Sequence, residues 1–128
     1  MNRPNAKVFH LTAKSESTIY SLIKSNFPNL NVDRVIHSGG VWHLKHRIID
    51  PTKLIKVGQT IKIYSCPTQG YQYHFAKNFI IKETSEWVAV YKEPLITIAM
   101  DRSNMFFNLM AGLKGYYQNK NMKKNATN

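Results

Sequence analysis

Between residues 19 and 64, the apolar spacing of this chain changes from a helical period to a strand period. The helical period is carried by Ile19, Leu22, Ile23 and Phe27. These residues share one face of a helix, and Pro28 then ends it. In 60–64, apolar Ile61 and Ile63 alternate with Lys62, which is typical of a half-buried strand. Both periods in so short a stretch predict an α+β unit, with two short helices packed on a small antiparallel sheet.

The residues between these two patterns predict a second, shorter helix followed by a hairpin. Asn31 is a favourable N-cap for a helix whose apolar face includes Val35 and Ile36. Gly39-Gly40 supplies a residue suited to the left-handed conformation that commonly follows a helix. The other expected features are N-caps for the first helix at Ser15 and Ser17, a strand at 41–44, a polar turn at 45–47, and turns at 50–51 and 57–59.

The composition changes at 66–70, which we interpret as a hinge before a small β–β–α appendage. Two strands are predicted at 78–82 and 87–91, and the apolar run from Trp87 to Val90 is typical of a buried strand. Ser103 is the expected cap of a last helix, whose apolar face includes Phe107 and Leu113. The expected organisation is a basic N-terminal arm at 1–14, a first domain at 15–66, the appendage at 67–117 and a flexible polar tail at 118–128. As an alternative to the arm, a first irregular strand is expected around Val8–Leu11.

The charge of the chain indicates a polyanionic partner. It has 18 Lys and Arg residues against 7 Asp and Glu residues, a formal net charge of +11. In a protein of this size, such an excess favours nucleic acid, an anionic membrane surface or an acidic protein as the partner. Because 43% of the residues are hydrophobic, the chain can still bury a core, which excludes a disordered basic tail.

Cysteine and histidine usage points away from metal and cofactor chemistry. Cys66 is the single cysteine, so an intramolecular disulfide and a Cys-based zinc site are excluded. His43 and His46 have no third ligand nearby in the sequence, so we expect no metal and no cofactor. A lone cysteine fits a reducing compartment, and residues 1–10 contain no apolar signal region. No stretch approaches the roughly 18 apolar residues of a membrane span, so we expect a cytoplasmic protein.

From about Ser17 to Tyr64, the order of helix, short helix, Gly-Gly, strand, basic turn, Asp-Pro, Gly and strand resembles the S4 RNA-binding domain. The matching stretches are 32–42 (VDRVIHSGGVW), 47–51 (RIIDP) and 54–63 (LIKVGQTIKI). The resemblance implies an S4-like fold at 15–66 that docks on structured RNA, either ribosomal or transfer RNA. The family often has Asn-Gly in its hairpin, whereas this chain has Leu44-Lys45, which does not favour a tight two-residue turn.

Residues 40–110 also resemble the front of a large-subunit-type (RluA-type) pseudouridine synthase, in which an S4 domain leads into the first strand pair of a catalytic domain. The corresponding stretches are 80–83 (IIKE) and 87–92 (WVAVYK). Enzymes of this family use an Asp nucleophile in an Arg-Leu-Asp motif, which is absent here, and Asp101-Arg102 has the reverse order. The usual Lys-Pro-x-Gly is replaced at 92–95 by Lys-Glu-Pro-Leu. We therefore expect no catalytic residue in this chain, which is either a piece of such an enzyme or a relative that keeps only the RNA-binding part.

The S4 resemblance implies that the second helix and the hairpin face the RNA together. RNA binding needs cations that neutralise phosphates, and Arg adds bidentate contacts. Arg34 lies near the start of the second helix, where free backbone amides favour anions, and His37 lies one turn further along. Each such residue has the alternative role of a solvated surface group. The predicted RNA-binding residues are Lys24, Arg34, His37, Lys45, His46, Arg47 and Lys53.

Two other functions stay open at this stage. The first is the N-terminal part of a pseudouridine synthase, whose isomerisation of RNA uridines needs a catalytic domain that this chain lacks. The second is a protein-interaction module that uses the apolar helix at 103–117 as its contact surface. For the favoured RNA-binding function we expect a monomer that binds neither a membrane nor a metal.

Overall fold

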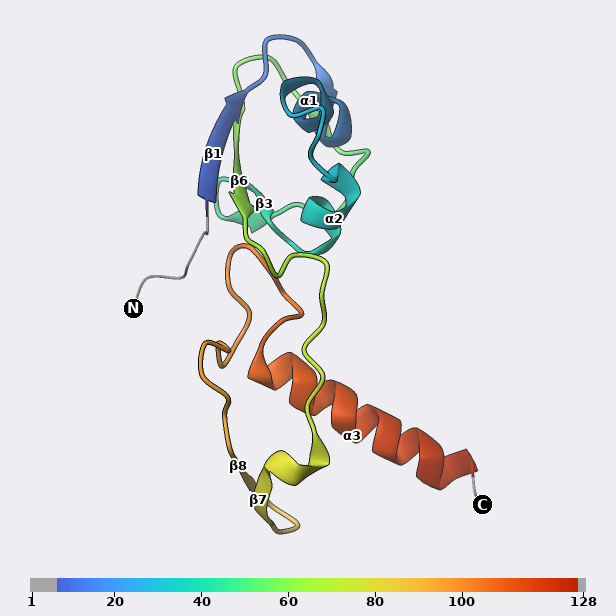
Figure 1. Cartoon of the computed structure of the whole chain (residues 1–128). Coiled ribbons are helices and arrows are strands. Elements are labelled where there is room, and N and C mark those ends of the chain that lie inside the picture. The colour runs from blue at the N-terminus through green and yellow to red at the C-terminus, as the bar shows by residue number, and fades with distance from the viewer. Residues whose placement is uncertain (1–6, 127–128) are drawn as a thin grey trace. The chain divides into compact units, whose positions relative to one another are not determined.

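The computed structural model describes residues 7–126, with side chains up to residue 122, and the chain forms two compact units (Figure 1). The first unit comprises Met1–Gly70 and Asp101–Met105, and the second comprises Tyr71–Met100 and Phe106–Asn128. The described residues combine three α-helices with small antiparallel sheets, so the expected α+β class is confirmed. The division after Gly70 falls at the end of the expected hinge. Residues 101–105 belong to the first unit, whereas the sequence analysis placed them in the appendage at 67–117.

A four-stranded antiparallel sheet in the order β1-β6-β3-β4 organises the first unit. Its strands are β1 (Lys7–Thr12), β6 (Thr60–Ser65), β3 (Val41–His43) and β4 (His46–Arg47). β6 is central, because it pairs with β1 along its whole length and with β3 on its other side. A separate short ladder pairs β2 (Ser17–Thr18) with β5 (Leu54–Ile55). Of the two possibilities for the N-terminal residues, the strand is confirmed at Lys7–Thr12, where Phe9 and Leu11 pack against the core.

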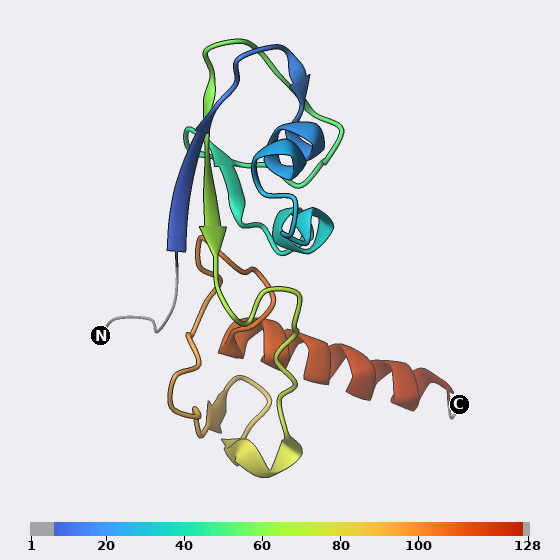
Figure 2. The ribbon, with the colours of Figure 1, turned by 45° about the horizontal axis from the view of Figure 1, so that its top comes forward.

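Two helices, α1 (Ile19–Asn26) and α2 (Val32–His37), lie on the same side of this sheet in both ribbon views (Figures 1 and 2). The cap of α1 is Thr18, whose hydroxyl accepts a hydrogen bond from Ser21 N at 3.1 Å, so the expected caps at Ser15 and Ser17 are wrong. The cap of α2 is Asn31, as expected. Gly39 has a φ of +87° and follows the helix as the left-handed residue that the sequence predicts.

The first core lies between the two helices and the inner face of the sheet. Ile61 and Ile63 of β6 are fully buried there, while Lys62 between them is exposed on the other face, as the alternation predicts. Full burial of each such aliphatic side chain contributes about 1.5–3 kcal/mol before the entropy cost of folding. The other fully buried aliphatic side chains in this core are Ile19, Ile23, Val32, Ile36, Val41 and Ile55.

The second unit contains the short helix η1 (Lys77–Phe79), the strand pair β7 (Ile80–Glu83) and β8 (Val88–Val90), and the helix α3 (Leu109–Ala126). The strands predicted at 78–82 and 87–91 are therefore present. Trp87 lies outside β8 and is 52% exposed, and Val88–Val90 are only half-buried, so the expectation of a buried strand at 87–90 is wrong. A two-stranded ladder has no further strands to cover its side chains.

The start and end of α3 both differ from the sequence expectation. Asn108 Oδ1 accepts a hydrogen bond from Ala111 N at 2.8 Å at the start of the helix, whereas Ser103 lies well before it and bonds Asp101. The helix runs to Ala126, so most of the expected flexible tail at 118–128 is helical. The apolar face of α3 packs inside its own unit. Its Leu109, Leu113 and Tyr116 belong to the cluster around Tyr73 and Phe75.

A buried tyrosine joins this second core to an acidic side chain. The hydroxyl of Tyr73 donates a 2.7 Å hydrogen bond to Glu93 Oε1. Burial first, and then the bonded carboxylate, raise the pKa of Tyr73 to about 12. The close approach of Gly112 to the ring requires a glycine, because a Cβ there would lie 2.6 Å from Tyr73 Cδ1. Tyr73 is thus held by α3 on one side and by Glu93 on the other.

Alkaline pH is expected to destabilise the second unit through Tyr73. Because the folded pKa is raised, the stabilisation is fully present below the ordinary tyrosine pKa of about 10 and is lost as pH rises towards about 12. Tyr73→Phe should flatten the fall in unfolding free energy over this range, whereas Tyr91→Phe, at an exposed tyrosine, should leave it unchanged. Urea unfolding at several pH values measures both. Equal pH profiles for the wild type and Tyr73→Phe would contradict this assignment.

Candidate nucleic-acid interface

Two of the predicted RNA-binding residues form an exposed cationic edge on α2. Arg34 and His37 lie one turn apart, and both side chains are exposed. The stem of Arg34 runs across Gly70, where a Cβ would lie only 2.5 Å from Arg34 Cδ. Gly70 has a φ of +87° and donates its N–H to Ser38 Oγ at 2.8 Å, so the 66–70 segment holds this approach in place. The position of Arg34 therefore depends on a close backbone contact that the sequence did not suggest.

The start of α2 offers fewer free amides than the sequence argument assumed. Asn31 Oδ1 accepts a hydrogen bond from Arg34 N at 3.1 Å, which caps one of the amides at the first turn. A capped helix start has fewer donors left for an anion. The side chains of Arg34 and His37 are therefore the groups of α2 on which the argument for a phosphate contact rests.

Arg47 is half-buried and is engaged by side-chain and backbone contacts within the first unit. Its guanidinium lies 4.7 Å from the centre of the Trp42 ring, its partner across the β3–β4 pair. It also donates a hydrogen bond to the carbonyl oxygen of Asp101, and its stem lies against Gly39. Desolvation lowers the pKa of Arg47, while the carboxylate of Asp101 opposes that shift. The half-buried Arg47 therefore holds parts of the first unit together.

The segment 101–105 is the partner of Arg47, and sequence analysis gave it no role in the site. The Trp42 indole Nε1 donates to the Arg102 carbonyl at 2.8 Å, and Met105 N donates to the Ser38 carbonyl at 2.8 Å. Asp101 Oδ1 shapes the segment by accepting from both N and Oγ of Ser103, at 2.7 and 2.6 Å. The Asp-Arg-Ser-Asn run at 101–104 is a recognisable turn signal. Its partners Arg47, Trp42 and Ser38 lie 54 to 67 residues earlier and carry no such signal.

The remaining predicted contacts are exposed but scattered. Lys24 lies in the last turn of α1, and Lys45 lies in the two-residue turn between His43 and His46. That turn forms although Leu44 must adopt a φ of +56° in place of the usual glycine or asparagine. Lys53 lies near Asp50, whose pKa is lowered by its hydrogen bonds to Thr52 and further by the charge of Lys53.

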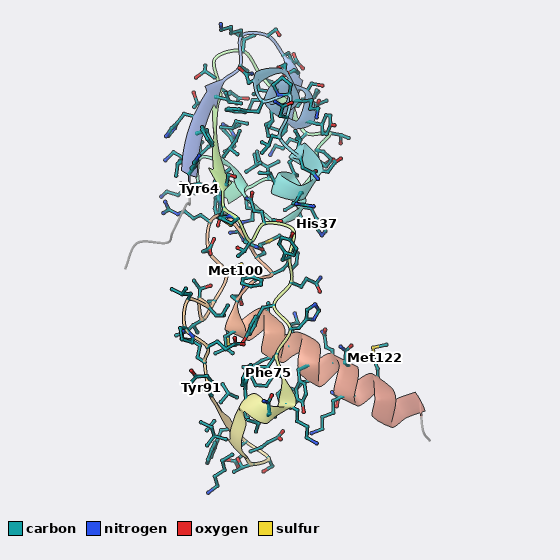
Figure 3. All side chains as sticks on the ribbon, in the orientation of Figure 1. His37, Tyr64, Phe75, Tyr91, Met100 and Met122 are labelled. Atoms are coloured by element: carbon teal, nitrogen blue, oxygen red, sulfur yellow. The ribbon has the colours of Figure 1, made fainter. Side chains whose placement is uncertain are left out.

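Side chains of the first unit lie on two sides of its sheet (Figure 3). His37 lies on the helical side, with α2, whereas Tyr64 of β6 lies on the opposite, open side of the sheet. The open side carries His10, Lys62 and Arg102, none of which sequence analysis proposed as a site residue. Sequence analysis missed these residues because only the strand register shows which basic residues of separate strands become neighbours.

Other classes of site find no support among the described residues. Nowhere in 7–122 do three or more His, Cys, Asp or Glu side chains gather as a metal site would require. Within the described helices, no segment combines the length and the apolar character needed to cross a bilayer. Comparisons with protein-family models, with curated proteins and with solved structures each returned no match to this chain. The functional argument therefore rests on the chemistry of the surface.

Replacing Arg47 is expected to affect stability before it affects binding. Arg47→Ala removes the cation–π contact with Trp42 and the hydrogen bond to the Asp101 carbonyl, and should lower the unfolding free energy by about 1–3 kcal/mol. Lys45→Ala, a neighbouring exposed cation, should change it by less than about 0.5 kcal/mol. Urea denaturation compares the two variants. If Arg47→Ala lowered the unfolding free energy as little as Lys45→Ala, Arg47 would have no structural role.

Proposed function

We propose that this chain is an RNA-binding protein whose first unit is S4-like and docks on structured RNA, ribosomal or transfer RNA, through the cations on its helical side. The observation that carries the proposal is the exposed pair Arg34 and His37 on α2, with its position set by Gly70. Arg can contact phosphate oxygens bidentately, and a histidine one turn away offers a further donor to phosphate or to a 2′-OH group.

The charge balance of the first unit supports this proposal. Met1–Gly70 and Asp101–Met105 contain eleven Lys and Arg residues against four acidic residues, Glu16, Asp33, Asp50 and Asp101. Two of these acids are engaged locally, Asp50 by Thr52 and Asp101 by Ser103. A unit with this excess attracts polyanions at long range, while exposed side chains on α2 provide the short-range contacts.

Stem-loop binding tests the α2 assignment. Arg34→Ala/His37→Ala should weaken binding to an RNA stem-loop about tenfold and reduce the salt dependence by roughly one phosphate contact. The control Lys56→Ala also removes one positive charge from the exposed surface of this unit, and its effect should be much smaller. Fluorescence anisotropy at two salt concentrations, with a DNA duplex of equal length as competitor, gives both quantities. Equal weakening by the two variants would mean that the net charge acts diffusely.

The second unit favours one further candidate, the N-terminal part of a pseudouridine synthase. Large apolar side chains are exposed around its strand pair, with Ile81 at 72%, Trp87 at 52% and Tyr91 at 51% exposure. A two-stranded sheet seldom suffices by itself, and apolar exposure of this kind is typical of a surface that further structure would cover. Neighbouring strands of a larger catalytic sheet would do so. The apolar helix at 103–117 gives less support to a protein-interaction module, because α3 uses its apolar face internally.

An exposed apolar strand pair has a measurable consequence. The chain should bind an environment-sensitive apolar dye while still folded, and Ile81→Ser/Trp87→Ser should remove most of that signal because both side chains are on the exposed surface. A matched variant, Val57→Ser, alters an exposed apolar residue in the first unit and should leave most of the signal in place. A folded wild type that binds no dye would argue against an uncovered sheet.

A further inference from the structure

The open side of the four-stranded sheet carries a row of polar and aromatic side chains that crosses every strand. His10 of β1 is opposite Lys62 of β6, Lys62 is opposite Trp42 of β3, and Trp42 is opposite Arg47 of β4. Residues in one such row lie on the same face, with adjacent strands about 4.7–4.9 Å apart. We use the term sheet face for His10, Trp42, Lys62 and Tyr64, with Arg102 at its edge.

The aromatic rings of the sheet face are held in place by arginines. Arg47 lies over Trp42, and the guanidinium of Arg102 lies 5.9 Å from the centre of the Tyr64 ring. Arg102 also donates a 3.3 Å hydrogen bond to the Tyr64 hydroxyl, while its carbonyl accepts from the Trp42 indole. The segment 101–105 thus fixes both rings before any ligand binds. This reduces the conformational entropy that is lost on binding.

Basic side chains dominate the sheet face. Lys62 lies at its centre with Arg102 at its edge, and the four strands contain no Asp or Glu. Lys62 is exposed, with the exposed His10 on one side and Trp42 on the other, and forms no salt bridge to any described side chain. Asp101, beside Arg102 in the sequence, acts on Arg47 at the far end of the row. A phosphate group at Lys62 would therefore supply an opposite charge that the strands themselves do not provide.

We propose that the sheet face binds unpaired nucleotides of RNA, in addition to the structured-RNA contact proposed for α2. Unpaired bases can stack on aromatic rings and on guanidinium planes, while Lys62 and Arg102 neutralise the phosphates. A duplex hides its base faces and gains nothing from the rings. A membrane surface would favour several exposed aliphatic groups, whereas this side of the sheet carries Val8, opposite Tyr64 and 49% exposed, among polar and aromatic side chains. Side chains on the same face of one strand are about 6.8 Å apart. A face two such rows deep and four strands wide has room for about two or three nucleotides.

Fluorescence of Trp42 tests this proposal directly. In a Trp87→Phe background, Trp42 is the only tryptophan, and base stacking quenches indole emission. A short oligouridine with no secondary structure should quench the emission of Trp42 when it is added. Its affinity should fall as the salt concentration rises. Lys62→Ala should weaken this binding several-fold, Lys62→Arg should restore it, and Lys56→Ala should have little effect. These exposed side chains lie outside the core, so the variants should fold as the parent does.

Several outcomes would overturn the proposal. One is oligouridine binding, seen by anisotropy, that leaves Trp42 emission unchanged, because the strand would then lie elsewhere. A second is equal quenching by an RNA duplex or by polyglutamate, which would indicate a general polyanion site. The absence of oligouridine binding is the third. The α2 proposal is judged separately with the stem-loop and Arg34→Ala/His37→Ala, so either proposal can fail while the other stands.

Discussion

The alternation of side chains along β6 governs the first unit. Because β6 is the central strand, Ile61 and Ile63 must both enter the core beneath α1 and α2, and Lys62 must then point to the other side. A shift of one residue in register would bury Lys62 and expose both isoleucines, at a cost far larger than any surface interaction. The same constraint that builds the core therefore also places the cation in the middle of the sheet face.

Arg47 illustrates how a basic protein uses its charges for different purposes. Its contacts with Trp42 and the Asp101 carbonyl tie the β3–β4 hairpin to a segment that comes from much later in the chain. Truncating a half-buried cation leaves its partners without their contacts, so the loss appears in the unfolding free energy. Reduced RNA affinity of an Arg47 variant would therefore report on folding as well as on contact. Exposed residues such as Arg34 and Lys62 provide a cleaner test of binding.

The two proposed contacts suit an RNA with both paired and unpaired parts. Side chains on α2 can reach phosphate and 2′-OH groups of a folded RNA, whereas the fixed rings of the sheet face need bases that are free to stack. His37 and Tyr64 lie on opposite sides of the first unit, so a ligand that used both would have to pass around it.

Local signals in the sequence were sufficient for most elements of the first unit. The helix period at 19–27, the Asn31 cap, the Gly39 stop and the alternation at 60–64 each depend on neighbours within one or two turns, and each appears in the structure. Strand pairing, the return of 101–105 and the structural role of Arg47 depend on residues far apart in the chain. Periodicity and capping do not encode which distant segments meet, because that choice is made by the packing of the whole core. The sequence alone therefore determined most elements of the first unit and the excess of positive charge, and only the tertiary structure decided which basic residues share a surface.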